Sequence, residues 1–258
     1  MRVGAVGDLH CGKASQGAFQ SLFAAASGAA DVLLLCGDLT DYGLPDEARV
    51  LARELATGLR IPAVAVLGNH DYESGQQAEV AQILRDGGVT ILDGDGCEVG
   101  ELGIAGVKGL GGGFGERALQ PWGEEVFKRF VREAVDEALK LESALARLRT
   151  PRRIAMLHYS PIQETVEGEA LEVYPFLGSS RLEEPLNRYP VDLVFHGHAH
   201  HGRPQGRTRG GVPVYNVCLP LLRALDPERP PFRVIELPTA PAAPPTPAAE
   251  AASAAPFA

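Results

Sequence analysis

The chain has 258 residues, a hydrophobic content of 45% and a formal net charge of −9 at pH 7. It is long enough for one sizeable core, and its acidic balance argues against a protein that coats extended nucleic acid. No apolar run approaches the ~20 residues of a membrane-spanning helix, and the start, MRVGAVGDLH, lacks the apolar length of a secretory signal.

The cysteines are scattered along the chain without a CxxC pair: Cys11, Cys36, Cys97 and Cys218. This usage is typical of reduced thiols rather than of a disulfide framework. Because Cys11 and Cys36 adjoin candidate ligands, metal binding is an alternative for them. A buried thiol that packs as a small hydrophobic residue is the preferred interpretation. Together these features predict a cytoplasmic protein that is not attached to a membrane.

Short continuous apolar runs predict strands that are buried on both faces. These runs are RVGAV at 2–6, DVLLLC at 31–36, AVAVL at 63–67, RIAML at 153–157 and VDLVF at 191–195. Each run ends at a polar or glycine-rich corner. Helical patterns separate the first runs, and in such α/β sheets ligands bind beyond the carboxyl ends of the strands.

Helices are predicted over 16–30, 45–59, 76–86 and 122–149. The last of these carries an apolar stripe from Val126 to Leu148, which we interpret as core packing rather than as a partner-binding surface. Three later segments are predicted to be β-structure, namely a hairpin over 97–107 and strands over 212–219 and 232–237. From Pro238 the chain is rich in proline and alanine, which predicts one domain at 1–237 and a disordered tail at 238–258.

Histidines concentrate at the ends of these strands. The stretch DLVFHGHAHHG at 192–202 holds four of the seven histidines, and His198 and His200 point the same way if it is extended. Asp8 and His10 repeat this spacing after the first strand. The corners of the next three strands carry Asp38, Asn69, His70 and His158. Histidine is the commonest protein metal ligand, so the pattern predicts a metal centre, although a hydrogen-bonded turn would explain one HxH pair alone.

The donor atoms are oxygen and nitrogen without thiolate, which suits Mn, Fe, Zn or Co. There are too many candidate ligands for one ion, so we expect two ions about 3.5–4 Å apart that share a carboxylate. Two such cations would lower the pKa of a bound water and neutralise phosphate oxygens. His70, one residue beyond a candidate ligand, would act as the general acid for the leaving oxygen, because imidazole titrates near neutral pH.

The ordered motifs of the chain resemble those of calcineurin-like metallophosphoesterases. The motifs are Asp8-x-His10, Gly37-Asp38, Gly68-Asn69-His70-Asp71, a lone His158 and Gly197-His198-x-His200. The resemblance spans residues 3–218 and implies an α/β fold, a four-layer α/β/β/α sandwich of two mixed sheets with the metals at the strand ends.

The resemblance also implies a role for each matched residue. Asp8, His10 and His200 would hold the first ion. Asn69, His158 and His198 would hold the second, with Asp38 bridging the two. Asp41 would orient His70, although a simple turn residue is the alternative for Asp41. His196 and His201 lie outside the matched pattern, and we interpret them as structural or supporting residues.

Three further signals are discounted. GLGGGFG at 109–115 lacks the GxGxxG spacing of a dinucleotide-binding loop, so we expect a flexible loop at the rim of the site. HGHAHH differs from the HxHxDH motif of metallo-β-lactamase-like hydrolases, because His200 stands where that motif requires Asp. Arg203, Arg207 and Arg209 could meet a substrate phosphate, but the solvated turn of a hairpin is the preferred interpretation.

The substrate class follows from departures within the family. Its protein phosphatases carry an arginine after the position of Asp41, whereas this chain has Tyr42. The pattern is closer to class III cyclic-nucleotide phosphodiesterases and related bacterial phosphodiesterases. We therefore predict a phosphodiesterase for a small phosphorylated substrate, a class that includes nucleotides, with specificity set by 109–125 and 161–184. A phosphomonoesterase or nucleotidase, a nuclease of the same family and a catalytically silent scaffold are the alternatives.

Overall fold

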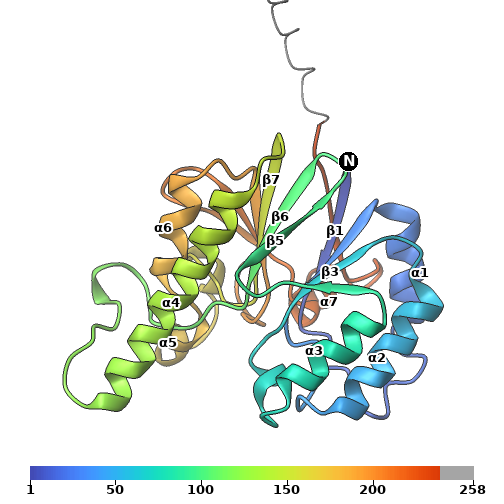
Figure 1. The fold of residues 1–258 in the computed structure, drawn as a ribbon, viewed down its shortest axis with the longest axis horizontal. Coiled ribbons are helices and arrows are strands. Elements are labelled where there is room, and N and C mark those ends of the chain that lie inside the picture. The colour runs from blue at the N-terminus through green and yellow to red at the C-terminus, as the bar shows by residue number, and fades with distance from the viewer. Residues whose placement is uncertain (239–258) are drawn as a thin grey trace, which may run out of the picture.

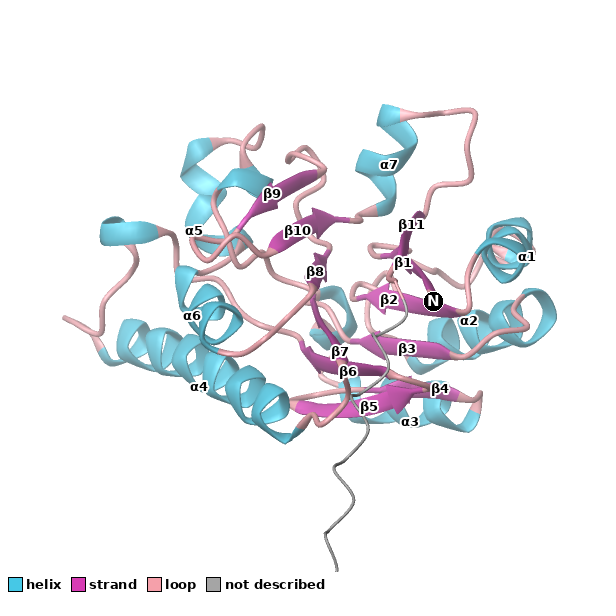
Figure 2. Cartoon of the chain, turned by 90° about the horizontal axis from the view of Figure 1, so that it is seen from above, coloured by secondary structure: helices cyan, strands magenta, loops and turns pink. Residues whose placement is uncertain are grey.

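The computed structural model describes residues 1–238 of the chain. In this part of the chain two β-sheets pack face to face, and helices cover their outer faces (Figure 1, Figure 2). The predicted disordered tail lies outside the described residues, apart from Pro238. Among the described helices, none combines the length and the apolar character that crossing a bilayer requires.

The first sheet has the strand order β11-β1-β2-β3-β4. Its strands are β1 (Arg2–Val6), β2 (Val32–Cys36), β3 (Ala63–Val66), β4 (Val89–Ile91) and β11 (Arg233–Glu236). Strands β1 to β4 run parallel, and β11 pairs antiparallel with β1 at the edge. The helices that cover its outer face are α1 (Gln20–Ala29), α2 (Pro45–Gly58) and α3 (Gln77–Asp86) (Figure 1).

The second sheet has the strand order β5-β6-β7-β8-β10-β9. Its strands are β5 (Asp95–Val99), β6 (Leu102–Val107), β7 (Arg152–Leu157), β8 (Leu193–His196), β9 (Gln205–Arg207) and β10 (Pro213–Asn216). The four central strands run parallel, and β5 and β9 pair antiparallel at the two edges. The helices α4 (Glu125–Arg147) and α6 (Ser180–Arg188) cover the outer face of this sheet (Figure 2). The remaining α-helices of residues 1–238 are short, α5 (Tyr174–Leu177) and α7 (Leu219–Leu225).

Three layers of buried side chains hold this sandwich together. Strand β2 shows why, because its five residues are all buried and alternate between two cores. Leu33 and Leu35 pack with α1, α2 and α3, whereas Leu34 and Cys36 pack between the sheets. A third core joins the second sheet to α4 and α6. The four-layer sandwich of two mixed sheets expected from the motif resemblance is confirmed.

The predicted strands and helices are confirmed with two corrections. The strand predicted over 212–219 ends at Asn216, and Leu219 begins α7, where a proline suits the first turn. The stripe of α4 is buried only from Val131 onward, and Val126 is 58% exposed. The first turns of α4 extend past the ends of the strands, so no sheet covers them (Figure 1).

Candidate metal centre and active site

The carboxyl ends of the parallel strands meet at one edge of the sandwich, and the predicted site residues follow them. Asp8 and His10 lie beyond β1, Asp38 and Asp41 beyond β2, Asn69 and His70 beyond β3, His158 beyond β7, and His198 and His200 beyond β8. The two sheets touch at this edge, because Gly7 N donates to Val217 O at 2.9 Å. Segments nearly two hundred residues apart are thereby brought together.

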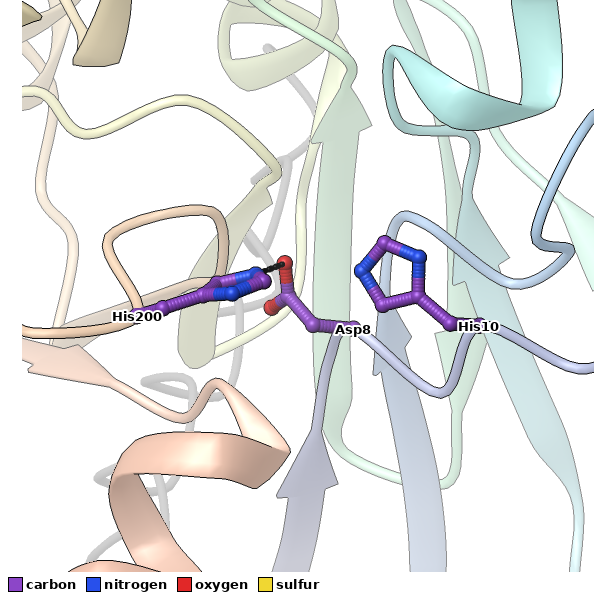
Figure 3. Close-up of side chains that lie close together, drawn as sticks. All are labelled: Asp8, His10 and His200. Atoms are coloured by element: carbon purple, nitrogen blue, oxygen red, sulfur yellow. Dashed lines mark hydrogen bonds and ion pairs between the residues drawn. The ribbon is translucent and has the colours of Figure 1, made fainter.

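The first group of candidate ligands contains Asp8, His10 and His200. Asp8 lies between the two imidazole rings (Figure 3). His200 Nε2 is 3.1 Å from Asp8 Oδ1, and the ring centroids of His10 and His200 are 5.6 Å apart. The ligand atoms of the three residues fall within 4.8 Å of one another, which is a separation that one cation could span.

The second group contains Asp38, His158 and His198, with Asn69 beside them. His158 Nε2 is 2.9 Å from Asn69 Oδ1 and 3.3 Å from Asp38 Oδ1. The other ring nitrogen, Nδ1, lies 3.0 Å from the carbonyl of Cys36 and must carry a hydrogen to bond with it. This bond fixes the tautomer that leaves Nε2 free as a ligand, as is usual for metal-binding histidine.

Asp38 lies between the two groups, and it forms a third possible group with His10 and His70. Its Oδ1 faces His158, and its Oδ2 is 3.8 Å from His10 Nε2. One carboxylate therefore offers an oxygen to each group, which is the geometry that a bridging ligand needs. The backbone N–H of His70 donates to Oδ1 at 2.8 Å and holds this orientation.

Backbone strain is confined to the same residues. Within the described chain, the non-glycine residues with positive φ are Asp8, His10, Asp38 and His198, with φ between 45° and 70°. All four are candidate ligands. Such conformations cost of order 1–3 kcal/mol each and persist where the surrounding structure enforces them, commonly at functional sites.

The donor set fits a pair of cations. His10 Nε2 is buried without a hydrogen-bond partner among the described residues, although it lies between the carboxylates of Asp8 and Asp38. An unpartnered buried nitrogen is costly unless something else binds it. A metal ion would satisfy this nitrogen, and it would also balance the buried negative charge of the two aspartates.

The charges of these buried side chains compensate one another. Burial lowers the pKa of His158, but the charge of Asp38 and its hydrogen bond outweigh burial and raise it to about 9. Burial favours the neutral form of Asp38, yet His158 and the backbone of His70 hold the Asp38 pKa well below its usual range. Burial and the nearby charge of His158 lower the pKa of His198 to about 4, which leaves its ring neutral and able to bind metal.

Asp71 is a buried residue that supports this centre, a role that the motif Gly68-Asn69-His70-Asp71 did not predict. Its carboxylate accepts hydrogen bonds from the backbone N–H groups of Leu39, Thr40 and Gly68 at 2.8–3.1 Å, and from the Thr40 hydroxyl at 2.6 Å. These bonds tie the loop that follows Asp38 to the loop that carries Asn69. A short acidic side chain at the end of GNHD was the available signal.

Asp41 contacts His70, as the resemblance implies, but through a different atom. His70 Nδ1 lies 2.7 Å from the backbone carbonyl of Asp41, whereas the carboxylate of Asp41 lies 3.5 Å from His10 Nδ1. The N–H of Asp41 donates to Cys11 O, which ties the loop that carries Asp41 to the loop that follows His10. The expected carboxylate–imidazole contact is thus replaced by a backbone contact, and His70 Nε2 is left free.

His196 and His201 lie outside the ligand groups. His196 is fully buried, its Nε2 is 2.8 Å from Thr165 Oγ1, and Thr165 in turn bonds to Ser160. Burial lowers the pKa of His196 to about 4, so the ring is a neutral structural link between β8 and the segment after His158. His201 is exposed, and its backbone N–H donates to Glu169.

Two of the discounted signals have clear structural roles. The glycine-rich segment 109–115 is packed rather than flexible, which corrects the expectation. Gly112 and Gly113 donate to the carbonyls of Pro175 and Gly178, and a Cβ at Gly111 would lie 2.4 Å from Pro175 O. Small residues are therefore required for this close approach. The three arginines lie in and beside the hairpin, as the preferred interpretation has it. Arg203, Arg207 and Arg209 bond to Glu167, Gly211 and Glu183, respectively.

Comparisons with known proteins agree with this architecture. The family model of calcineurin-like phosphoesterases matches residues 1–202. Phosphopantetheinyl hydrolase from Mycobacterium tuberculosis superposes with a TM-score of 0.67 at 15% identity, over 90% of this chain and 95% of that one. A protein assigned as a 5′-nucleotidase from Staphylococcus aureus, solved with α-ketoglutarate, superposes with a TM-score of 0.51 at 16% identity, over 83% of this chain and 48% of that one.

At these identities the two structures show a shared fold and nothing finer. No curated protein matches the sequence. The family model, by contrast, covers more than three quarters of the chain and spans every candidate ligand. The motifs, the four-layer sandwich and the ligand geometry agree with it, and the chain therefore belongs to the calcineurin-like phosphoesterase family.

Proposed function

We propose that this protein is a phosphodiesterase that uses two metal ions and His70 as the general acid. Asp8, His10 and His200 would hold one ion, and Asn69, His158 and His198 the other, with Asp38 shared. Mn, Fe and Zn suit these oxygen and nitrogen donors. When bound, such a pair supplies charge neutralisation for phosphate oxygens and activation of water. The observation that carries the proposal is the pair of adjoining ligand groups around Asp38.

His70 would deliver the proton that the leaving oxygen requires. Its Nδ1 is hydrogen-bonded to the Asp41 carbonyl, so the protonated ring presents Nε2 to the substrate. The ring of His10 lies edge-on at 4.4 Å, and the ligand atoms of His70, His10 and Asp38 fall within 4.8 Å of one another, which places the proposed acid directly against the metal centre. A group in this position can exchange its proton with solvent between turnovers, because the side chain is 34% exposed.

The decisive test compares His70→Gln with His201→Gln in the Mn-restored protein. His201 is a matched control, since it lies in the same histidine cluster without belonging to a ligand group. We expect His70→Gln to lose roughly 10²–10⁴-fold in kcat on an alkyl phosphodiester, as is typical for a general acid. The loss should be smaller on bis-p-nitrophenyl phosphate, because nitrophenolate leaves without a proton.

Two results would overturn the proposal. Activity that survives chelation would contradict the role of the metal centre. Equal rates for His70→Gln and His201→Gln on the alkyl ester would contradict the role of His70 as the general acid. Phosphomonoesters and short oligonucleotides belong in the same assay, because the ligand geometry would serve those substrates as well. A catalytically silent scaffold is disfavoured because no candidate ligand is missing.

A cytoplasmic location is part of the proposal, and the four free cysteines accord with it.

A further inference from the structure

A cavity of about 300 Å³ lies beside the ligand cluster, between α3, β4 and the end of β6. Leu67 and Tyr72 line the cavity and bracket the ligand Asn69 in the chain. Lys108 lines it from the other sheet, and the Lys108 carbonyl accepts the N–H of His158 at 3.0 Å. The cavity and the metal centre are therefore held in one fixed relation.

Lys108 stands where the cavity meets the ligand cluster. On β6, Ala105 and Val107 face the outer core, so alternation directs the next residue, Lys108, between the sheets. Its Nζ lies 5.3 Å from the ring centroids of both Tyr72 and Tyr159. On its other side, Tyr159 lies 4.5 Å from the ring centroid of the ligand His198. The ammonium group is thus one tyrosine side chain away from the metal ligands.

The lining of this cavity has a surplus of positive charge. Within residues 1–238, Lys108 Nζ donates to Gly109 O at 2.8 Å, Arg85 Nη2 donates to Ile91 O, and neither forms an ion pair. Asp93 also lines the cavity and Glu137 lies nearby, but both acids are already paired, since they bind Lys140 at 3.1 and 2.8 Å. Two cations are therefore left with free hydrogen-bonding capacity in a protein of net charge −9.

A polar atom in the same wall also lacks a partner. Gln77 Oε1 is buried, and no hydrogen bond to it is formed by the described residues. A half-turn about the last side-chain bond exchanges the amide oxygen and nitrogen, so the group can equally present its NH₂ to a ligand. A buried amide without a partner is costly, and a bound polar group would remove that cost.

We propose that this cavity binds a second, non-scissile phosphate of the substrate, with Lys108 and Arg85 as its cationic partners. The inference rests on the proposed function, because it takes the scissile phosphoester to lie at the metal centre. The apolar part of the wall, formed by Leu67, Ala81 and Leu92, would contact the carbon framework between the two phosphates.

The test uses two chromogenic phosphodiesters that differ by one phosphate, thymidine 5′-(p-nitrophenyl phosphate) and its 3′-phosphorylated form. The Mn-loaded full chain should prefer the 3′-phosphorylated ester in kcat/KM. Lys108→Met should lower that preference by roughly 10- to 100-fold, the effect of a lost charged hydrogen bond. Arg85→Gln, on the exposed face of α3, should lower it less. Lys13→Met is the matched control, because Lys13 Nζ lies 3.5 Å from Asp46 and outside the cavity.

Binding separates failure of the subsite from failure of the function. Calorimetry compares thymidine 3′,5′-bisphosphate with thymidine 5′-phosphate on the same variants and needs no turnover. If the protein binds the bisphosphate more tightly than the monophosphate in a way that depends on Lys108, but hydrolyses neither ester, the subsite is supported and the proposed phosphodiesterase activity is wrong. If both esters are hydrolysed and the ratio of their kcat/KM values is the same in Lys108→Met as in Lys13→Met, the proposed subsite is wrong but the phosphodiesterase activity stands. Absence of any binding difference between the two nucleotides would also overturn it.

Discussion

Asp71 offers the sharpest test of how the fold builds the site. In Asp71→Asn the side chain keeps its shape but exchanges one acceptor oxygen for an NH₂ group. Oδ2 accepts from Leu39 and Gly68, and Oδ1 accepts from Thr40 N and Thr40 Oγ1. The favourable orientation places NH₂ at Oδ1, because the hydroxyl of Thr40 can rotate and become an acceptor. One buried backbone N–H, that of Thr40, then loses its partner.

The cost of this exchange can be estimated from the hydrogen bonds. An unsatisfied buried N–H costs about 1–3 kcal/mol, and the remaining bonds lose the assistance of the negative charge. Burial and the charge of Asp38 raise the pKa of Asp71, so the neutral amide recovers part of that penalty. We expect a loss of about 2 kcal/mol in the free energy of unfolding, which corresponds to a fall of roughly 4–8 °C in Tm.

Glu54→Gln is the matched control for stability. Glu54 is also buried and accepts backbone N–H bonds from Gly17 and Phe19 at 2.8 and 3.0 Å, but it lies on α2 and binds the segment that precedes α1. We expect both variants to lose similar stability in urea titrations of the metal-free protein. Only Asp71→Asn should weaken Mn²⁺ binding, by roughly 10–100-fold, because it frees the loops that carry Asp38 and Asn69.

Two outcomes would refute this reasoning. If Asp71→Asn and Glu54→Gln weaken Mn²⁺ binding equally in calorimetry, the support of the metal centre by Asp71 is wrong. If Asp71→Asn retains the stability of the wild type, then the assignment of an orphaned Thr40 N–H is wrong, whatever the metal affinity becomes.

Three further outcomes are expected. Burial lowers the pKa of His158, but its acidic surroundings outweigh burial and raise the pKa to about 9, above the value in the unfolded chain. The stability that this shift gives to the metal-free protein is therefore complete below the unfolded pKa. It is lost as the pH rises through 9. Metal must displace that proton, so Mn²⁺ affinity should rise about tenfold per pH unit from neutral pH toward 9, and calorimetry showing no proton release would contradict this. Gly68→Ala should abolish metal binding, because its Cβ would lie 2.2 Å from the Asp38 backbone nitrogen, whereas Gly28→Ala, with open space around it, should bind metal normally. Thr165→Val should cost about 1–3 kcal/mol of unfolding free energy by leaving His196 Nε2 unpaired; a denaturation midpoint equal to that of the wild type would contradict it.

Strand ends were the most predictable part of the site. Val32–Cys36 is a continuous apolar run, and a run that is buried on both faces places the next polar residue, Asp38, at the edge of a sheet. Helix ends and edge strands were less predictable. The β4 and β9 strands have three residues each, which is too short for a periodic pattern, and their pairing depends on neighbours far along the chain.

The local contacts around the ligands lay beyond prediction from the sequence. The atom of Asp41 that meets His70 depends on how the loops after β1, β2 and β3 pack together; Asp41 N donates to Cys11 O, and the Asp41 carbonyl meets His70 Nδ1. The packing of the segment 109–115 depends on the carbonyls of Pro175 and Gly178, more than sixty residues away. The exposed start of α4 depends on where the sheet ends, which the periodicity of one helix does not encode.

By itself, the sequence determined the chemical kind of the site and the order of its parts, because ligand types and apolar runs are local properties of the chain. The tertiary structure alone decided which carboxylate lies between the two ligand groups, that Asp71 ties their loops together, and that Lys108 faces a cavity beside them. These are distances between residues of different strands and loops. They are set when two sheets pack against each other, and no spacing along one chain records them.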